Sequence, residues 1–468
     1  PSTSFRPSID RLEMRNLLTT FMVINPVDGE DGSLRDAIEQ ANLSKGPDTI
    51  KFAMNVKEIQ VSSQLLITDD LRIDGPGASK LTVNGDGDRV FALVPSKYAE
   101  EAPDLLTRPT AEQLTDAPSV KIKGLTIANG ESSNALGLPD AEGFSFGGGI
   151  YNLGSDLHLD RVQMTGNTAV GPVTAGGAVA NEFGGTLTVS RSEFIGNLST
   201  GEVVAVGGAI TSDSGRTDDG TEEGEPTQPP EVSIDRSSFV ENKAEVLFAG
   251  NLGAPFTGLG GGGAVLNVTG TMTITRSDFV SNAAMGGPGD GALSGGAGFG
   301  GAILSGDVSP FAVADSKLIV SRSTFTGNTA TGGSSSSLDV PGGIAAGGAI
   351  SVGNGSDATL ERNSFDSNSA AGGNGGLNAD GGIATGGGVS GAGLATLLLN
   401  RNQFVDNTAM GGSGGGGTGT DAAGRGGGLG LDTIMLAGFD PGTATASSDS
   451  DSFVGNIAYG GIGGGIYN

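Results

Sequence analysis

The sequence predicts an all-β protein, a single-stranded parallel β-helix of about eleven coils with one short capping helix near its N-terminus. Three observations support this prediction. A short motif returns along most of the chain, glycine pairs return between its copies, and the alternation of apolar residues changes phase inside each unit. Self-similarity of this kind is typical of stacked repeats, in which each unit buries its apolar face against the next.

The motif reads Arg-Ser-x-Phe-x-x-Asn. Complete copies occupy 191–197, 236–242, 276–282 and 322–328, and copies with Asn in place of Ser occupy 362–368 and 401–407. A degenerate first copy over 161–167 has Met164 in the Phe position, and a degenerate last copy ends at Asn456. Between the copies stand Gly-Gly segments, which end at Ile150, Val179, Ile210, Val265, Ile303, Ile350, Val389, Leu429 and Ile466.

The phase of the apolar residues places a corner inside the motif. Leu187 and Val189 alternate ahead of Phe194, which falls on the opposite phase. Because side chains alternate strictly along a strand, one straight strand cannot bring all three to the same face. A corner is therefore expected at Arg191 and its two neighbours. Each unit then has three short strands separated by a Gly-rich, an Arg-Ser and an Asn corner, which is one coil of a parallel β-helix.

We divide the chain into a lead-in segment over 1–24, an N-terminal cap over 25–50 and the β-helix over 51–468. In the cap, Ser33 is expected to begin the only convincing helix, over 33–43, with Asp36 returning the capping hydrogen bond. Loop insertions are expected near 95–118, 213–230, 244–260, 283–299, 329–345, 369–385 and 408–425. Insertions restricted to a few positions of a unit indicate loops that leave one or two edges of a solenoid.

The repeated residues have structural roles in this interpretation. Phe at the same place in successive coils is expected to stack into an internal row. The corner Asn is expected to join its carboxamides into a hydrogen-bonded row and to tolerate the left-handed backbone of the corner. Gly-Gly is expected to supply a positive φ and a tight turn.

The Arg of the motif is expected to form an outward column, one residue for each coil. Its members are Arg161, Arg191, Arg236, Arg276, Arg322, Arg362 and Arg401. Like charges so close together repel one another, but Asp160, Asp235 and Glu361 precede three members and can interleave opposite charge. Two interpretations remain open: a solvated, partly paired ladder, or a basic stripe that binds an acidic polysaccharide.

Composition excludes several classes of function. The chain of 468 residues has no Cys, one His and a net charge of −27, so nucleic acid and anionic membranes are poor partners. No apolar run approaches the ~20 residues that a transmembrane helix needs. The lone His158 is expected to face outward from a strand, and the acidic segment 218–225 to be a solvated loop.

No residue stands out as catalytic, cofactor-binding or metal-binding. The turn over 84–88, Asn-Gly-Asp-Gly-Asp, faintly resembles a calcium turn but lacks the distal Glu, so an ordinary turn is the preferred interpretation. Glycoside cleavage needs two positioned carboxylates, and no such pair is evident in the sequence. We therefore expect a non-enzymatic protein and keep a polysaccharide lyase, a glycoside hydrolase or an acidic-glycan-binding module as alternatives.

The Gly-Gly-Ala-Ile and Phe-x-x-Asn pairs resemble the repeats of chlamydial polymorphic outer-membrane proteins and related bacterial β-helix surface proteins. Gly-Ser-Leu-Arg-Asp-Ala-Ile at 32–38, with Asp-Thr-Ile-Lys-Phe at 48–52, is similar to the CSLREAI-type start of bacterial extracellular β-helix proteins, with Gly in place of Cys. The run over 6–18 resembles the lead-in of large planctomycete surface proteins. The resemblance covers nearly the whole chain. It implies a right-handed parallel β-helix that is secreted or exposed at the cell surface, and it implies no catalytic residues.

The expected function is structural or adhesive, outside the cell or on its surface. The partners expected are an extracellular polysaccharide or a second copy of the chain. The sequence stops in the first strand of a further coil, over 463–468. Since an open strand edge is a template for pairing, we expect either a longer natural protein or head-to-tail stacking into filaments.

Overall fold

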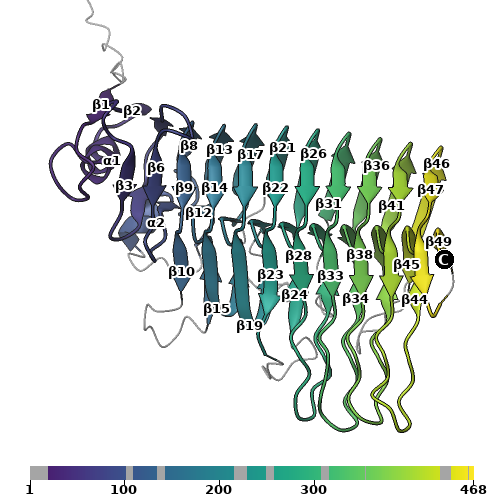
Figure 1. The fold of residues 1–468 in the computed structure, drawn as a ribbon. Coiled ribbons are helices and arrows are strands. Elements are labelled where there is room, and N and C mark those ends of the chain that lie inside the picture. The colour runs from purple at the N-terminus through teal and green to yellow at the C-terminus, as the bar shows by residue number, and fades with distance from the viewer. Residues whose placement is uncertain are drawn as a thin grey trace, which may run out of the picture.

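The computed structural model describes residues 19–468 except 102–108, 134–142, 215–228, 249–257, 307–315, 354, 433–443 and 462. These residues wind into coils that stack along one axis, and their strands form four parallel sheets (Figure 1). The predicted parallel β-helix is confirmed. Two of the sheets that enclose the core have 11 strands each, which agrees with the expected number of about eleven coils.

Three sheets enclose the main core, and the chain visits them in the order sheet 1, sheet 2, sheet 3. Sheet 1 contains β1 (Thr20–Val23), β2 (Asp48–Phe52), β5 (Leu71–Asp74), β8 (Ser119–Lys123), β13 (Asp156–Asp160), β17 (Thr186–Ser190), β21 (Glu231–Asp235), β26 (Gly270–Thr275), β31 (Ser316–Ser321), β36 (Asp357–Glu361), β41 (Thr396–Asn400) and β46 (Thr445–Asp449).

Sheet 2 contains β3 (Glu58–Gln60), β6 (Thr82–Asn84), β9 (Thr126–Ala128), β14 (Gln163–Thr165), β18 (Glu193–Ile195), β22 (Ser238–Val240), β27 (Asp278–Val280), β32 (Thr324–Thr326), β37 (Ser364–Asp366), β42 (Gln403–Val405) and β47 (Ser452–Val454). Sheet 3 contains β4 (Leu65–Ile67), β7 (Phe91–Leu93), β12 (Ile150–Leu153), β16 (Val179–Glu182), β20 (Ile210–Ser212), β25 (Val265–Asn267), β30 (Ile303–Ser305), β35 (Ile350–Val352), β40 (Val389–Ala392), β45 (Leu429–Asp432) and β49 (Ile466–Tyr467).

A fourth sheet, the fin, lies between sheets 2 and 3 in chain order from the coil of β8 onward, so the expectation of three strands for each coil is correct for the two coils before it and wrong for the later ones. Its strands are β10 (Glu131–Ser133), β11 (Phe144–Phe146), β15 (Thr168–Ala175), β19 (Leu198–Val206), β23 (Lys243–Val246), β24 (Leu259–Gly261), β28 (Ala283–Met285), β29 (Gly298–Phe299), β33 (Thr329–Thr331), β34 (Ala345–Ala346), β38 (Ser369–Ala371), β39 (Ala384–Thr385), β43 (Thr408–Met410), β44 (Gly424–Arg425) and β48 (Ile457–Tyr459). The fin was missed because its strands consist largely of Gly, Ala, Ser and Thr, which carry no apolar alternation.

The Phe residues of the motif stack inside the coils, as expected. From Phe194 to Phe453, successive ring centroids are 4.6–4.9 Å apart and the planes differ by 3–14°. The rings of Phe194, Phe239, Phe279 and their counterparts as far as Phe404 are fully buried. Met164 continues the stack at its N-terminal end, in register with Phe194. The corner at the Arg makes this possible, since it reverses the phase between sheet 1 and sheet 2.

The motif Asn residues form a second buried row. The Oδ1 atom of each Asn accepts two hydrogen bonds of 2.9–3.1 Å from the preceding Asn of the row, one from its backbone N–H and one from its Nδ2. Each Nδ2 also donates to a carbonyl of the coil before, as Asn242 does to Phe194 at 2.9 Å. Both polar atoms of the carboxamide are thereby satisfied without water, as a buried amide requires.

The Asn does not itself adopt the left-handed backbone, so that expectation is wrong. Positive φ falls on the residue before it, such as Glu241 at 55°, Ser281 at 55° and Asp406 at 50°. The physical reason is that the carboxamide must point into the coil, whereas the preceding side chain is outward and has no fixed contact to keep. The Gly-Gly expectation is confirmed, because the first Gly of each pair has a positive φ, as Gly300 does at 62°.

The Ser of the motif forms a third row, along the Arg corner. Each Ser Oγ accepts the backbone N–H of the preceding coil, as Ser237 does from Ser192 at 3.2 Å. Asn363 takes over this position and accepts from the backbone N–H of Ser323 at 3.0 Å. The two motif variants therefore have the same structural role, since a Ser hydroxyl and an Asn carboxamide can each accept a hydrogen bond from a backbone N–H of the coil before.

From the coil of β8 onward, the chain enters the fin along one arm and leaves it along another, and the two arms lie face to face. Along the axis, like arms pair with like arms, as β28 pairs with β33 and β29 with β34. Small side chains separate the layers, among them the buried cluster of Ala345, Ala370, Ala384 and Ala409. The returning arm also packs on the outer face of sheet 3, where Phe299 and Leu304 belong to a second apolar core.

Farther out, the insertions over 283–299, 329–345, 369–385 and 408–425 continue the fin as stacked loops (Figure 1). One row of backbone hydrogen bonds crosses these loops, each N–H donating to the preceding carbonyl at 2.8 Å, in the order Gly287, Gly296, Gly333, Gly343, Gly373, Gly382 and Gly412. A Cβ built on Gly333, Gly373 or Gly382 would overlap a carbonyl oxygen of another arm. The arms are thus close because they have no side chains.

The N-terminal end has the expected helix, α1 (Leu34–Leu43), and a shorter one, α2 (Ser96–Glu101), that the sequence did not predict. The Ser33 side chain accepts from Asp36 N, while the Asp36 carboxylate accepts from the backbone N–H of Gly32 at 2.7 Å, one residue earlier than expected. In α2, Tyr98 is buried in an apolar cluster against sheet 3. Across the described ranges, neither helix is long and apolar enough to cross a membrane.

Replacing Phe279 by Ala is expected to lower the free energy of unfolding by about 3–5 kcal/mol, because the neighbouring rings cannot close the cavity left in the stack. Denaturant unfolding followed by circular dichroism measures the change. Val280→Ala, on the half-buried side chain next to it, is the control. Equal stability of the two variants would contradict an internal Phe row.

Gly373→Ala is expected to lower the free energy of unfolding by about 1–3 kcal/mol, because the added methyl group overlaps the carbonyl of Gly333. Ser336→Ala, at an exposed position of the neighbouring loop, is the control and is expected to stay within about 0.5 kcal/mol of the parent chain. Faster amide hydrogen exchange confined to the fin loops of Gly373→Ala would locate the damage. A protected fin in both variants is the result that rejects close backbone packing.

Candidate functional site

The Arg column lies on the corner between sheet 1 and sheet 2, and each of its residues has a left-handed backbone. Their φ values are 48–57°, for Arg161, Arg191, Arg236, Arg276, Arg322, Arg362 and Arg401. Each backbone N–H donates to a carbonyl of the next coil, as Arg191 does to Asp235 at 3.0 Å. The side chains point away from the core, and those in ion pairs remain about half exposed.

Carboxylates interleave with part of this column, as expected. Asp160 lies between Arg161 and Arg191, with N–O distances of 3.0 and 2.6 Å. Asp235 pairs in the same way with Arg236 and Arg276. Glu361 pairs with Arg362 at 3.1 Å.

Two members of the column, Arg322 and Arg401, make no ion pair with the described residues. Arg322 follows Ser321 and Arg401 follows Asn400, so neither has an acidic residue directly before it. The column is therefore a ladder that is only partly neutralised.

Asp160 is held ionised by this arrangement. Burial acts to raise its pKa, but hydrogen bonds from Arg191, Ser190 and Arg161 together with the charge of Arg161 outweigh that effect and lower the pKa below its usual range. The carboxylate thus keeps its charge at neutral and moderately acidic pH and holds both guanidinium groups in place.

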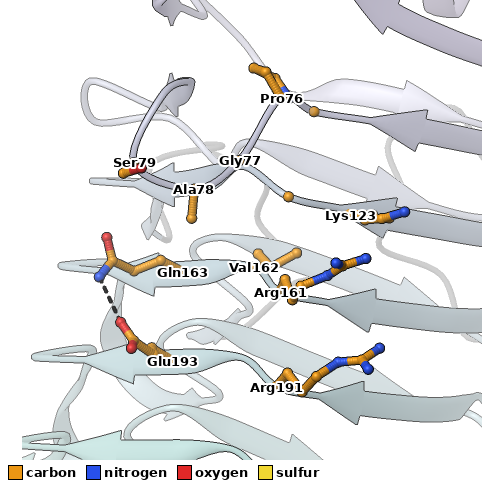
Figure 2. Close-up of a pocket in the computed structure, with 12 residues that line it drawn as sticks. Pro76, Gly77, Ala78, Ser79, Lys123, Arg161, Val162, Gln163, Arg191 and Glu193 are labelled. Carbon is orange, nitrogen blue, oxygen red and sulfur yellow. Dashed lines mark hydrogen bonds between the residues drawn. The ribbon is translucent and has the colours of Figure 1, made fainter.

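A hollow of about 530 Å³ opens at the N-terminal end of the column. It is lined by Gly75, Pro76, Gly77, Ala78, Ser79, Lys123, Gly124, Arg161, Val162, Gln163, Arg191 and Glu193. Figure 2 shows the side chains of Lys123, Arg161 and Arg191 extending in one direction, while Gln163 and Glu193 lie on the opposite side, joined by a 3.0 Å hydrogen bond. The turn with Pro76 and Ser79 forms the end of the hollow.

The hollow exists because two coils depart from the repeat. The corner after Asp74 extends over several residues rather than one, and its backbone binds the next coil through Gly75 N to Lys123 O at 2.8 Å. In that next coil Gly124, with φ of 62°, replaces the corner Arg, and a Cβ on Gly75 would overlap its carbonyl. The Asp of the strand end is also replaced, by Lys123, which stands in register with Asp160.

This arrangement is suited to binding an anion. Lys123, Arg161 and Arg191 present cations on consecutive coils, and Asp160 is their close counter-charge. Arginine forks match the planar geometry of carboxylates and sulfates. The hollow is open to solvent and its carboxylate Glu193 is hydrogen-bonded by Gln163, so it offers no isolated acid and base across a sugar.

The remaining sequence candidates are placed as follows. His158 faces outward from β13, as expected, and lies 3.1 Å from Asp156. In the turn over 84–88, Asn84 accepts the backbone N–H of Asp86 at 3.2 Å. Across the described ranges, no cluster of three or more His, Asp or Glu side chains is arranged to hold a metal ion. The preference for an ordinary turn over a calcium site stays a prediction, and the acidic segment 218–225 lies outside the described residues.

Sequence reasoning identified the Arg column but missed the hollow. The available signal was the break in the repeat, Lys-Gly at 123–124 where the next coils have Asp-Arg or Ser-Arg. The residues Asp-Gly-Pro-Gly at 74–77 are typical of a turn between strands, and they form part of the extended corner. Its position next to Arg161 results from the stacking of the coils, and the order of residues along the sequence does not reveal that proximity.

No family model matches the chain, and no curated protein matches it. Tailspike protein 3 of bacteriophage CBA120 is a similar solved structure, with 12% identity, a TM-score of 0.34, and 91% of this chain covering 59% of that one. The surface adhesin PfbA of Streptococcus pneumoniae has 11% identity and a TM-score of 0.34, with 93% and 94% covered. The A-module of mannuronan C-5 epimerase AlgE6 of Azotobacter vinelandii has 11% identity and a TM-score of 0.26, with 90% and 95% covered. At these values the likeness does not extend to activity or ligand.

Asp160→Asn is expected to lower the free energy of unfolding at pH 7 by about 1 kcal/mol, because two guanidinium groups lose their shared carboxylate. The pKa of Asp160 is lower in the folded chain than in the unfolded chain. The contribution is therefore present above the unfolded pKa and is lost as the pH falls through the folded one. Unfolding curves between about pH 7 and pH 2 measure it, with the exposed Asp357→Asn as the control. A difference that persists at the acid end contradicts the ion-pair explanation.

Proposed function

We propose that this protein is an extracellular or cell-surface rod with a structural and adhesive role, which binds an acidic polysaccharide at the hollow and along the Arg column. The observation that carries the proposal is the cluster of Lys123, Arg161 and Arg191 at an open hollow, in a chain with a net charge of −27. Since the rest of the surface repels anions, such a ligand would be confined to cationic sites.

The repeated residues leave one outward position for recognition. The Phe, Asn and Ser side chains of the motif are buried, where they stack or form hydrogen bonds inside the rod. Only the Arg side chain recurs on the outside. A recognition surface that repeats with the coils must therefore include it.

The backbone of the column supports a role for the guanidinium groups. A left-handed conformation costs an ordinary residue roughly 1–2 kcal/mol, a cost that Gly avoids. Gly124 shows that Gly is accommodated at this corner. Arg nevertheless occupies it from Arg161 to Arg401. Strain retained in this way is typical of functional positions.

The spacing of the column suits a linear glycan. Neighbouring strands of a sheet lie ~4.8 Å apart, which is comparable with the length of one sugar ring. A chain laid along the corner would meet one cation for each coil. Arg322 and Arg401, which make no ion pair with the described residues, are the most available of these beyond the hollow.

Self-association through the last strands, β46 to β49, stays a prediction. Sedimentation at increasing concentration and electron microscopy test it. Uniform short rods at the highest concentration would reject filament formation.

The binding site is tested with immobilised polygalacturonate, alginate and chondroitin sulfate at low ionic strength. Lys123→Gln with Arg161→Gln is expected to weaken binding about 10-fold or more, because two cations of the hollow are lost. Lys317→Gln, which removes one outward cation of sheet 1 far from the hollow, is the control for the loss of a surface charge. The control should keep the melting temperature of the parent chain, and the hollow variant should stay folded at the assay temperature, because Asp160 keeps its ion pair with Arg191.

Two results would count against the proposal. Equal retention of the hollow variant and the Lys317→Gln control would remove the hollow as a site. Release of unsaturated or reducing ends from the same polysaccharides, incubated with calcium, would replace adhesion by a lyase or hydrolase activity.

A further inference from the structure

A second group of cations lies on the outer face of sheet 1, beside the hollow. Arg72, Lys121 and His158 stand opposite one another on β5, β8 and β13. Lys51 on β2 and Lys123 on β8 flank Asp74 on either side, and Asp74 also pairs with Arg72 at 2.8 Å. We call Lys51, Arg72, Lys121, Lys123 and His158 the cationic face.

The cationic face is accessible and local. Lys51, Arg72 and Lys121 are exposed, and His158 is partly exposed. In later coils the column through His158 continues with neutral side chains only, Thr188, Ser233 and Thr273 in register. The cations therefore concentrate in the coils that form the hollow.

Lys123 belongs to both surfaces. It lines the hollow, and it lies two residues from Lys121 on the same strand, so both side chains leave the same side of sheet 1. Two residues of a strand span roughly 7 Å. A ligand with one negative group in the hollow thus has a second set of cations within reach of its next negative group.

Resting on the proposed function, we infer that the anion site is an extended surface that continues from the hollow across the cationic face. Its ligand is then a polyanionic glycan with at least two negative groups roughly 7 Å apart or farther, rather than a single sugar acid. The cationic face supplies avidity, and the hollow supplies the anchoring contact.

The test compares the affinity of the protein for a polyanionic polymer with its affinity for a single anion. Dextran sulfate and inorganic sulfate are titrated against the parent chain, the double variant Arg72→Gln with Lys121→Gln, and the Lys317→Gln control. The double variant is expected to bind dextran sulfate about fivefold or more weakly, while its affinity for inorganic sulfate is unchanged. Replacing dextran sulfate by polygalacturonate distinguishes sulfate from carboxylate recognition.

The outcomes separate the inference from the proposed function. Full dextran sulfate binding by the double variant, with loss of binding in Lys123→Gln with Arg161→Gln, overturns the extended surface and leaves the hollow standing. Full dextran sulfate binding by both double variants overturns the extended surface and the proposed function together. Equal losses for polymer and inorganic sulfate would show one compact site and also reject the extended surface.

Discussion

The row of buried Asn carboxamides is the constraint on which the rest of the structure depends. Each carboxamide is closed off from water and has its hydrogen bonds satisfied by the coils before and after it. A coil that slipped by one residue would leave such groups unpaired, at a cost of about 1–3 kcal/mol each. The row therefore fixes the axial register, and the Phe stack and the Ser row follow from that register.

A fixed register also decides what the outside of the rod can present. Corner residues fall into columns, so the register aligns the Arg side chains, and the ion pairs to Asp160 and Asp235 add to this alignment. Residues that depart from the repeat are positioned by the same register. Gly124 and the extended corner before it alter two adjacent coils, and the result is a hollow whose cations are Lys123 of the altered coil and Arg161 and Arg191 of the coils after it.

The sequence was most informative where each repeated residue has one strong preference. Leu187 and Phe194 belong to opposite phases, which located the corner at Arg191 and with it the stacking of the coils. The fin was not predicted because residues such as Ala370 and Gly373 allow close packing through their small size. Small residues of this kind produce no alternation of apolar and polar side chains along the sequence. The hollow escaped because it joins Pro76 to Arg191 across coils, a proximity created by stacking.

The fin divides its sequence between positions that cannot vary and positions that can. Glycines of its arms, such as Gly373 and Gly382, leave no room for a side chain. The tips nevertheless differ within one chain, from Ser-Ser-Ser-Ser at 334–337 to Gly-Gly-Gly-Gly at 414–417. Leu338 and Leu377 stand exposed on adjacent tips, supported by arms that are nearly identical. Tip segments can thus diversify under selection while the rod beneath them inherits no change, as hypervariable loops do on a constant framework.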